Sequence, residues 1–277
     1  MAIITLTTDF GEKDYFAGAV KGAIYSELDQ VRIVDISHSI TPFHISEAAY
    51  TIKNAYRSFP KGSIHIIGID SELTPENKHL AVKLDDHYFI CANNGILSLL
   101  ASEINPEKIV EINIHDKIET NFPVLDVFVK VACHLARGGT LEVIGKTVTE
   151  IKYLKQYEPT VNSDKKQILG HVIYIDNYGN VITNISRKFF ENVRKGRDFT
   201  IRARNVSFSE IHEAYSHAIN FEVEKDKRRE EDGKKLAVFN SAGYIELAIY
   251  KSNLKTVGGA STLFGLDYLD TVTINFE

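Results

Sequence analysis

Apolar runs alternate with amphipathic stretches through the first half of the chain. The predicted strands are residues 3–8, 31–36 and 64–69, and the predicted helices between them are residues 14–28 and 46–59. Ser46 is the expected cap of the second helix. Strands that are apolar throughout and alternate with helices are typical of a sheet buried on both faces. We therefore expect a Rossmann-like α/β domain with a mainly parallel sheet.

The pattern continues with a predicted hairpin around Asp85 and Asp86, formed by residues 80–84 and 88–92. A helix from Gly95, a strand over residues 109–112 and a helix over residues 124–136 follow. Gly138 and Gly139 then end the last helix.

The period of the pattern changes after a polar, non-periodic stretch at residues 152–166. The short strands expected beyond it are residues 170–176, 181–185, 199–203, 236–239, 244–248 and 271–276. Turn residues separate them, which is typical of an all-β, barrel-like domain. We predict an α/β domain at 1–155, a linker at 156–167 and the β domain at 168–277. The charged run at 222–235 is expected to be a solvated loop or hairpin tip.

Composition narrows the function classes. Of 277 residues, 44% are hydrophobic and 25% are charged, as in an ordinary globular protein, and the net charge is −5. A basic excess is absent, so we expect no binding to nucleic acid or to anionic membranes. No apolar run reaches membrane-spanning length, and Cys91 and Cys133 lie in apolar stretches as buried hydrophobes. A cytoplasmic location is the expectation.

Acidic residues follow the predicted parallel strands. Asp9, Asp35 and Asp70 lie at or beside strand ends, and Asp14 heads the helix after Asp9. A single aspartate there is usually a turn former or a helix cap. Several on one sheet edge instead favour a cation or a hydroxyl-rich ligand, because like charges repel. No glycine-rich dinucleotide motif or phosphate-binding loop is present.

Two polar turns add candidate ligand groups. Asn93, Asn94 and Gly95 form a strand-to-helix turn, and residues 176–180 read Asp-Asn-Tyr-Gly-Asn between two strands. The second turn could be a plain hairpin turn. Its polar and aromatic side chains, Tyr178 among them, are also suited to recognising a base or a ribose.

Several segments, in order along nearly the whole chain, resemble the S-adenosylmethionine (SAM) hydrolases, also called SAM hydroxide adenosyltransferases, which are related to fluorinating and chlorinating enzymes. The segments are Thr8-Asp9-Phe10-Gly11 with Asp14, Gly18 and Lys21-Gly22; Val34-Asp35-Ile36-Ser37-His38 with Ile40-Thr41-Pro42; Phe59-Pro60-Lys61-Gly62; Asn93-Asn94-Gly95; Ile175-Asp176-Asn177-Tyr178-Gly179-Asn180 with Thr183-Asn184-Ile185; and Asn240-Ser241-Ala242-Gly243-Tyr244-Ile245-Glu246.

The resemblance implies a homotrimer that holds SAM or adenosine between subunits, with SAM as substrate or ligand and no cofactor. Asp9 would accept hydrogen bonds from the ribose hydroxyls, and Phe43 would line the ribose and adenine site. The residues that would hold the methionine end are Asp14, Asp176 and Ser241. Asn180 would recognise adenine, and Asn94 and Tyr178 complete the expected binding set. Carboxylates suit SAM because it carries a sulfonium and an ammonium.

The resemblance also implies a reaction in which water attacks the ribose C5′, giving adenosine and methionine. Asp70 falls where the family has a water-handling aspartate, which can accept a proton from the attacking water. Two family positions differ here: Asn77 replaces an arginine and Pro123 replaces a histidine. Lys78 or His79 could substitute from the same loop, although lysine lacks the planar fork of arginine.

Three hypotheses follow. The first is a SAM hydrolase with a reorganised catalytic set. The second is a SAM- or adenosine-binding protein without turnover. The third is a metal-dependent hydrolase that uses the strand-end carboxylates with His38, since carboxylates suit magnesium or calcium. The first is preferred, with no metal at the site.

Overall fold

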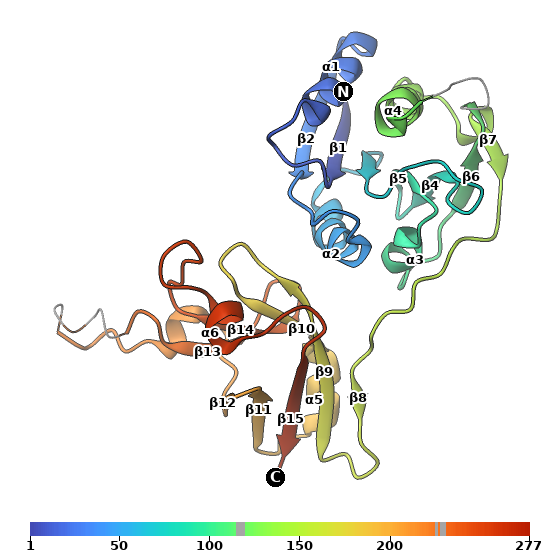
Figure 1. Ribbon diagram of the computed structural model, residues 1–277. Helices are drawn as coiled ribbons and strands as arrows, with labels where there is room; N and C mark the ends of the chain where they lie inside the picture. The colour runs from blue at the N-terminus through green and yellow to red at the C-terminus, as the bar shows by residue number, and fades with distance from the viewer. Residues whose placement is uncertain (115–119, 225–226, 228–230) are drawn as a thin grey trace. The chain divides into compact units, whose positions relative to one another are not determined.

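The computed structural model describes residues 1–114, 120–224, 227 and 231–277. The chain divides into two compact units, Met1–Lys155 and Gln156–Glu277 (Figure 1). Each unit has its own sheet and its own core, and each is described separately below.

The first unit contains a seven-stranded sheet in the order β2-β1-β3-β5-β4-β6-β7. Its strands are β1 (Ala2–Thr8), β2 (Val31–Ser37), β3 (Ile64–Gly68), β4 (His79–Leu84), β5 (His87–Ala92), β6 (Lys108–Ile112) and β7 (Gly145–Thr147). Its α-helices are α1 (Phe16–Glu27), α2 (Ile45–Ala55), α3 (Ile96–Leu100) and α4 (Val129–Ala136). Shorter turns of helix are η1 (Tyr56–Ser58), η3 (Val124–Phe128) and η4 (Leu141–Val143).

The sheet is mixed. β1 pairs in parallel with β2 and β3, and β3 with β5, whereas the pairs β5–β4, β4–β6 and β6–β7 are antiparallel. The expectation of a mainly parallel sheet therefore holds for one half, because the predicted hairpin places β4 in the opposite direction. The chain leaves β1 for β2 on one side and then crosses to β3 on the other. The carboxyl ends of β1 and β3 are thus adjacent at a point where α/β sheets bind ligands.

Helices cover both faces of this sheet (Figure 1). One core joins Ile4 and Ile66 of the strands to apolar side chains of α1 and α4, and a second core joins Ile67 to α2 and α3. Adjacent residues such as Ile66 and Ile67 point to opposite faces, as the two-residue period of a strand requires. The parallel strands are therefore apolar throughout, which explains the pattern in the sequence.

Two helix starts differ from the expectations. α2 begins at Ile45, and the ring Nδ1 of His44, rather than Ser46, accepts the capping bond from the Glu47 amide at 3.1 Å. The predicted helix at 124–136 is present, but its first turn is the π-helical η3, preceded by Pro123. Single π turns of this kind are frequent beside functional sites.

The second unit is an antiparallel, nearly closed, barrel-like sheet in the order β12-β11-β15-β9-β10-β14-β13, with β8 paired to β9. Its strands are β8 (Thr160–Val161), β9 (Gln167–Ile175), β10 (Val181–Ser186), β11 (Phe199–Ala203), β12 (Val206–Phe208), β13 (Lys235–Phe239), β14 (Tyr244–Ile249) and β15 (Thr271–Phe276). Its helices are α5 (Arg187–Arg194), the 3₁₀ turn η5 (Tyr215–Ala218) and α6 (Ala260–Phe264). All six strands predicted here are present. Residues 225–226 and 228–230 of the charged run at 222–235 lie outside the described residues.

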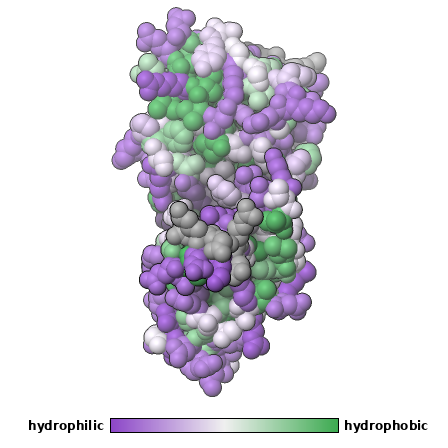
Figure 2. Space-filling view, turned by 90° about the vertical axis from the view of Figure 1, so that its left-hand side faces the viewer, coloured by the Kyte–Doolittle hydropathy of each residue, from purple (hydrophilic) through white to green (hydrophobic). Residues whose placement is uncertain are grey.

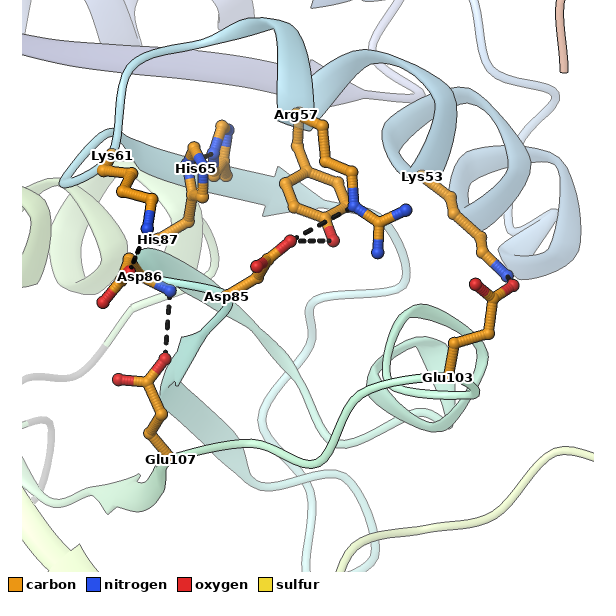
Figure 3. Close-up of polar contacts among 10 residues, drawn as sticks. Lys53, Arg57, Lys61, His65, Asp85, Asp86, His87, Glu103 and Glu107 are labelled. Atoms are coloured by element: carbon orange, nitrogen blue, oxygen red, sulfur yellow. Dashed lines mark hydrogen bonds and ion pairs between the residues drawn. The ribbon is translucent and has the colours of Figure 1, made fainter.

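The amino end of the parallel strands carries a dense group of paired charges (Figure 3). Arg57 contacts Asp85 at 3.1 Å, and Lys61 contacts Asp86 at 2.7 Å. Between these pairs, Nε2 of the buried His65 lies 3.1 Å from Nδ1 of His87. The hydrogen bonds from Arg57 and Lys61 are the main reason that the pKa values of Asp85 and Asp86 fall below the usual range. At this end of the sheet, cationic side chains of the same unit therefore neutralise Asp85 and Asp86.

Hydrophilic side chains predominate on the face shown in Figure 2, and hydrophobic ones form smaller separate patches. Within the described ranges, no helix combines the length and the apolar composition that crossing a bilayer requires.

Candidate active site

The carboxyl ends of β1 and β3 bring two acids together. Thr8 pairs with Gly68 in the parallel register, so Asp9 and Asp70 both follow the last paired residues of neighbouring strands. Their side chains are close enough for the charge of Asp70 to raise the pKa of Asp9. Neither carboxylate forms an ion pair with a cationic side chain in the described part of the chain. The two acids thus lie near each other at this edge of the sheet.

Asp9 is held as a half-buried hydrogen-bond acceptor. Burial is the largest cause of its raised pKa, and the nearby charge of Asp70 adds to it. The backbone amide of Phe43 opposes the shift by donating to Oδ2 at 2.9 Å. Phe43 adopts a left-handed backbone with φ 63°, and its ring is 72% exposed. The backbone amide of Asp9 itself also hydrogen-bonds the carboxylate and likewise opposes the rise in its pKa.

Asp70 begins a loop that Asn77 braces. Asp70 has a left-handed backbone with φ 43°, which aspartate tolerates better than most residues. The amide nitrogen of Asn77 donates to the carbonyls of Asp70 at 2.8 Å and Glu72 at 3.0 Å. Asn77 is buried, so the position that the resemblance assigns to an arginine has a structural task in this chain.

Lys78 and His79 differ in their access to this edge. His79 is fully buried; its Nε2 lies 2.9 Å from the Ser71 carbonyl and its ring packs edge-on against Phe128. Lys78 is partly exposed and makes no ion pair with a described carboxylate. Of these two residues, only Lys78 has a charged group that a ligand could reach. The buried His79 instead supports the loop through its contact with the Ser71 carbonyl.

An aromatic cluster lies beside the acids. The rings of Phe10, Phe16 and Phe122 pack with centroid separations of 5.3–5.7 Å. Phe122 precedes Pro123, the residue in the family's histidine position, and η3 follows. The three aromatic residues are partly exposed, and Phe10 directly follows Asp9 in the chain, so the cluster places aromatic surface next to this carboxylate.

Asn94 lies at the end of β5 and is buried. Its amide nitrogen donates to the Ile69 carbonyl at 2.9 Å, and its oxygen accepts from the Ile96 amide at 3.1 Å. These bonds tie the end of β3 to the start of α3. The side chain therefore fixes the backbone just before Asp70.

In the second unit, Asp176 organises the predicted polar turn. Its Oδ1 accepts from the backbone amides of Tyr178 at 2.9 Å and Asn180 at 2.8 Å, and its Oδ2 accepts from the Asn180 side chain at 3.0 Å. Gly179 has φ 80°, and a Cβ there would lie 2.9 Å from Gly259, so this turn requires glycine. Tyr178 is 64% exposed, whereas Asn180 is buried.

A buried carboxylate faces this turn, and sequence reasoning did not identify its role. Glu246 of β14 is 3% exposed and accepts from the Tyr215 hydroxyl at 2.5 Å. Burial raises the pKa of Glu246 and of Tyr215, and the charge of Asp176 raises both further. Ser241 is exposed in the turn before β14, where Asn240 accepts from the amides of Ala242 and Tyr244. In the sequence, the only indication of a role for Glu246 was its place in the segment 240–246 that resembles the family.

The predicted residues thus form two groups, each within one unit. Asp9, Phe43 and Asp70 meet in the first unit, where Asp14 is exposed before α1. Asp176, Tyr178 and Asn180 share one turn in the second unit. Asp35 is partly neutralised by Lys21, whose Nζ lies 2.5 Å from Oδ2. Among the residues that the structure describes, no three histidine, cysteine or acidic side chains gather as a metal ion requires.

The chain matches known proteins over nearly its whole length. Residues 4–145 match the SAM hydroxide adenosyltransferase N-terminal domain, and residues 170–273 match the C-terminal domain of the same family. A (R)-S-adenosyl-L-methionine hydrolase of Methanocaldococcus jannaschii is 29% identical over 98% of this chain and 95% of its own length. A fluorinase of Actinopolyspora mzabensis is 24% identical over 91% of this chain and 94% of its own.

A solved structure is similar over the full length. The crystal structure of an uncharacterized conserved protein from Thermotoga maritima matches with a TM-score of 0.82 and 26% identity, covering 99% of both chains. The fold of this chain is therefore that of a known structure along its whole length.

Proposed function

Because this chain belongs to the SAM hydroxide adenosyltransferase family, whose two domains it matches in order, we propose that it is a SAM hydrolase that forms adenosine and L-methionine. The observation that carries the proposal is the pair of adjacent carboxylates, Asp9 and Asp70, with no described cation against either. Such an edge attracts a cationic nucleoside, and SAM is one.

The proposed reaction is a displacement at the ribose C5′. Water attacks C5′ as the bond to sulfur breaks, methionine leaves as a neutral thioether, and the proton of the water passes to Asp70 and then to solvent. The sulfonium is already a good leaving group, so the site mainly has to align water and exclude bulk solvent. The reaction as proposed requires no cofactor and no metal.

The binding roles follow the two groups of residues. Asp9 would accept from the ribose hydroxyls, with Phe43 beside the ribose and adenine. In the second unit, Asp176 and Ser241, with Asp14 of the first, would hold the methionine end. Asn180 would recognise adenine, with Tyr178 and Asn94 completing the site. The first unit would act as a Rossmann-like nucleoside-binding domain, and residues 156–167 as the linker to the barrel-like domain.

We also propose a homotrimer with the ligand between subunits. Large aromatic side chains are exposed in both units: Tyr15 at 73% and Phe43 at 72% in the first, and Tyr178 at 64% in the second. A ligand and a neighbouring subunit would cover them. The proposed location is the cytoplasm, in keeping with two free, buried cysteine side chains.

A second candidate function is a protein that binds SAM or adenosine without turnover. Asn77 favours it, because its amide is committed to the carbonyls of Asp70 and Glu72 and it brings no positive charge. Pro123 cannot move a proton either. In this case Lys78 would assist binding only.

Product analysis separates the two candidates. Purified protein is incubated with SAM, and adenosine and methionine are measured chromatographically against a buffer control. We expect both products in equal amounts. Calorimetric binding of SAM without product would support the second candidate, and neither heat nor product would reject both. Light scattering of the same sample tests the trimer.

A further inference from the structure

His38 holds both ends of the loop that carries Asp9. Its Nδ1 lies 2.7 Å from the hydroxyl of Thr8, and its backbone carbonyl accepts from the Gly11 amide at 2.7 Å. Asp9 and Phe10 lie between these two attachment points. Thr8 and His38 are both buried, at 1% and 6% exposure. We call this arrangement of Thr8, Gly11 and His38 the His38 clamp.

Asp35, which is paired with Lys21, contacts the His38 imidazole at its other ring nitrogen, Nε2. Nε2 of His38 lies 3.1 Å from Oδ1 of Asp35, a close contact that is off the line of a hydrogen bond, and Oδ2 of Asp35 meets Lys21 at 2.5 Å. A carboxylate beside Nε2 favours the tautomer with the proton on Nε2, in which Nδ1 accepts from the Thr8 hydroxyl. The Phe10 amide in turn donates to the Thr8 hydroxyl oxygen at 3.4 Å.

The same strand carries a second pair of this kind away from the site. In the middle of β1, three residues before Thr8, the hydroxyl of Thr5 lies 2.7 Å from Nδ1 of His65, and both side chains are buried. The two pairs match in residue types, in distance and in burial. They differ in that only the Thr8 pair adjoins a carboxylate of the proposed site.

We propose that His38 is a positioning residue for Asp9, acting through Thr8 and Gly11, and that Lys21 and Asp35 orient its ring. The inference rests on the proposed function, in which Asp9 accepts from the ribose hydroxyls. A carboxylate recognises two hydroxyls only if it is held within a fraction of an ångström, and a supporting hydrogen-bond network supplies that precision.

The clamp also explains why this edge tolerates two adjacent acids. The repulsion between Asp9 and Asp70 would turn a mobile Asp9 toward solvent. Two attachments to one buried histidine, together with the Phe43 amide on Oδ2, keep its carboxylate at the strand end. The ligand then meets a pre-organised acceptor rather than one that must first be ordered.

The matched threonines test the clamp. Thr8→Val and Thr5→Val each remove one buried hydroxyl from β1 and keep the side-chain shape. Adenosine binding is measured by calorimetry, and unfolding by denaturant. We expect both variants to lose comparable stability, whereas only Thr8→Val weakens adenosine binding, by roughly tenfold. Asp35→Asn, at the exposed end, provides a milder variant with a loss of roughly threefold if Thr8→Val does not fold.

Coupling to Asp9 distinguishes positioning from a general loss of structure. If His38 acts through Asp9, Thr8→Val should change adenosine affinity by less than about twofold once Asp9→Asn is present. Equal effects in both backgrounds, or equal weakening by Thr5→Val, would overturn the inference.

Amide hydrogen exchange separates this inference from the proposed function. In the unliganded protein, Thr8→Val should speed exchange in peptides that contain Phe10 and Gly11, and Thr5→Val should not. Faster exchange in a protein that neither binds nor hydrolyses SAM would support the role of His38 in holding the loop and would reject the proposed function. Normal adenosine binding by Thr8→Val would contradict the inference about His38 and would leave the proposed function intact.

Discussion

The two ends of the first unit's parallel strands carry similar residues in opposite electrostatic states. At the amino end, Arg57 and Lys61 pair with Asp85 and Asp86 and lower the pKa values of these acids (Figure 3). At the carboxyl end, burial and the charge of Asp70 raise the pKa of Asp9.

This difference separates charged residues that stabilise the sheet from charged residues that can bind a ligand. The acids at the amino end already have cationic side chains as partners and need no ligand to neutralise them. Acids without a described cation at the carboxyl end carry an electrostatic cost that a positively charged ligand can relieve. Such residues are candidates for chemistry even where the family's histidine and arginine have been replaced.

The largest effect expected is on turnover. Asp70→Asn removes the proton acceptor of the proposed reaction and should lower kcat by about a hundredfold or more, as loss of a general base does. Asp86→Asn is the matched control: both aspartates have left-handed backbones, with φ 43° and 60°, which asparagine also adopts. It should leave kcat unchanged. Product formation from SAM measures both.

Two results would contradict this contrast between the two ends of the parallel strands. Full activity in Asp70→Asn would mean that the reaction needs no carboxylate at this edge. An equal loss in Asp86→Asn would mean that the two ends are not separate in function.

A smaller effect is expected at the amino end as the pH falls. Burial, with the neighbouring His87, lowers the pKa of His65 to about 3, so the folded state keeps it neutral while the unfolded chain takes up a proton near pH 6.5. Stability is therefore complete above pH 6.5 and is lost progressively toward pH 3. Between pH 7 and pH 5 the loss from this group should be about 2 kcal/mol.

Denaturant unfolding of the wild type and of His65→Asn measures this loss. The variant is less stable at pH 7 but should show a flatter profile between pH 7 and pH 5. An unchanged slope would show that another group is responsible. The proposed binding of SAM would depend on pH for a separate reason: the cation would bind ionised Asp9, whose pKa is raised, so binding would weaken as the pH falls.

The local pattern of the sequence predicted the elements and the edge where acids gather. Apolar runs indicated β1, β2 and β3, and from their order the meeting of Asp9 and Asp70 could be inferred. Hydrophobic periodicity indicates which faces of a strand are buried. The end of the apolar run then indicates where the strand ends.

Partners distant in the chain could not be predicted. Lys21 neutralises Asp35 from 14 residues away, and Tyr215 meets Glu246 from 31 residues away. Asn77 looked like a lost arginine, although its amide braces the loop that begins at Asp70. Such contacts depend on side-chain direction in the folded chain, which no sequence period records.

The smallest effect is expected for Lys61→Ala at the amino end. The Lys61 side chain is 78% exposed, and Asp86 retains a second cation, Lys83, at 3.7 Å. Exposed pairs contribute little because water and salt screen them, and Asp86 is not left without a partner. The urea midpoint at pH 7 and the rate of adenosine formation should both match the wild type. A clear drop in the midpoint would mean that the amino-end charges act as one network rather than as separate pairs, and double substitution with Lys83→Ala would then measure their coupling.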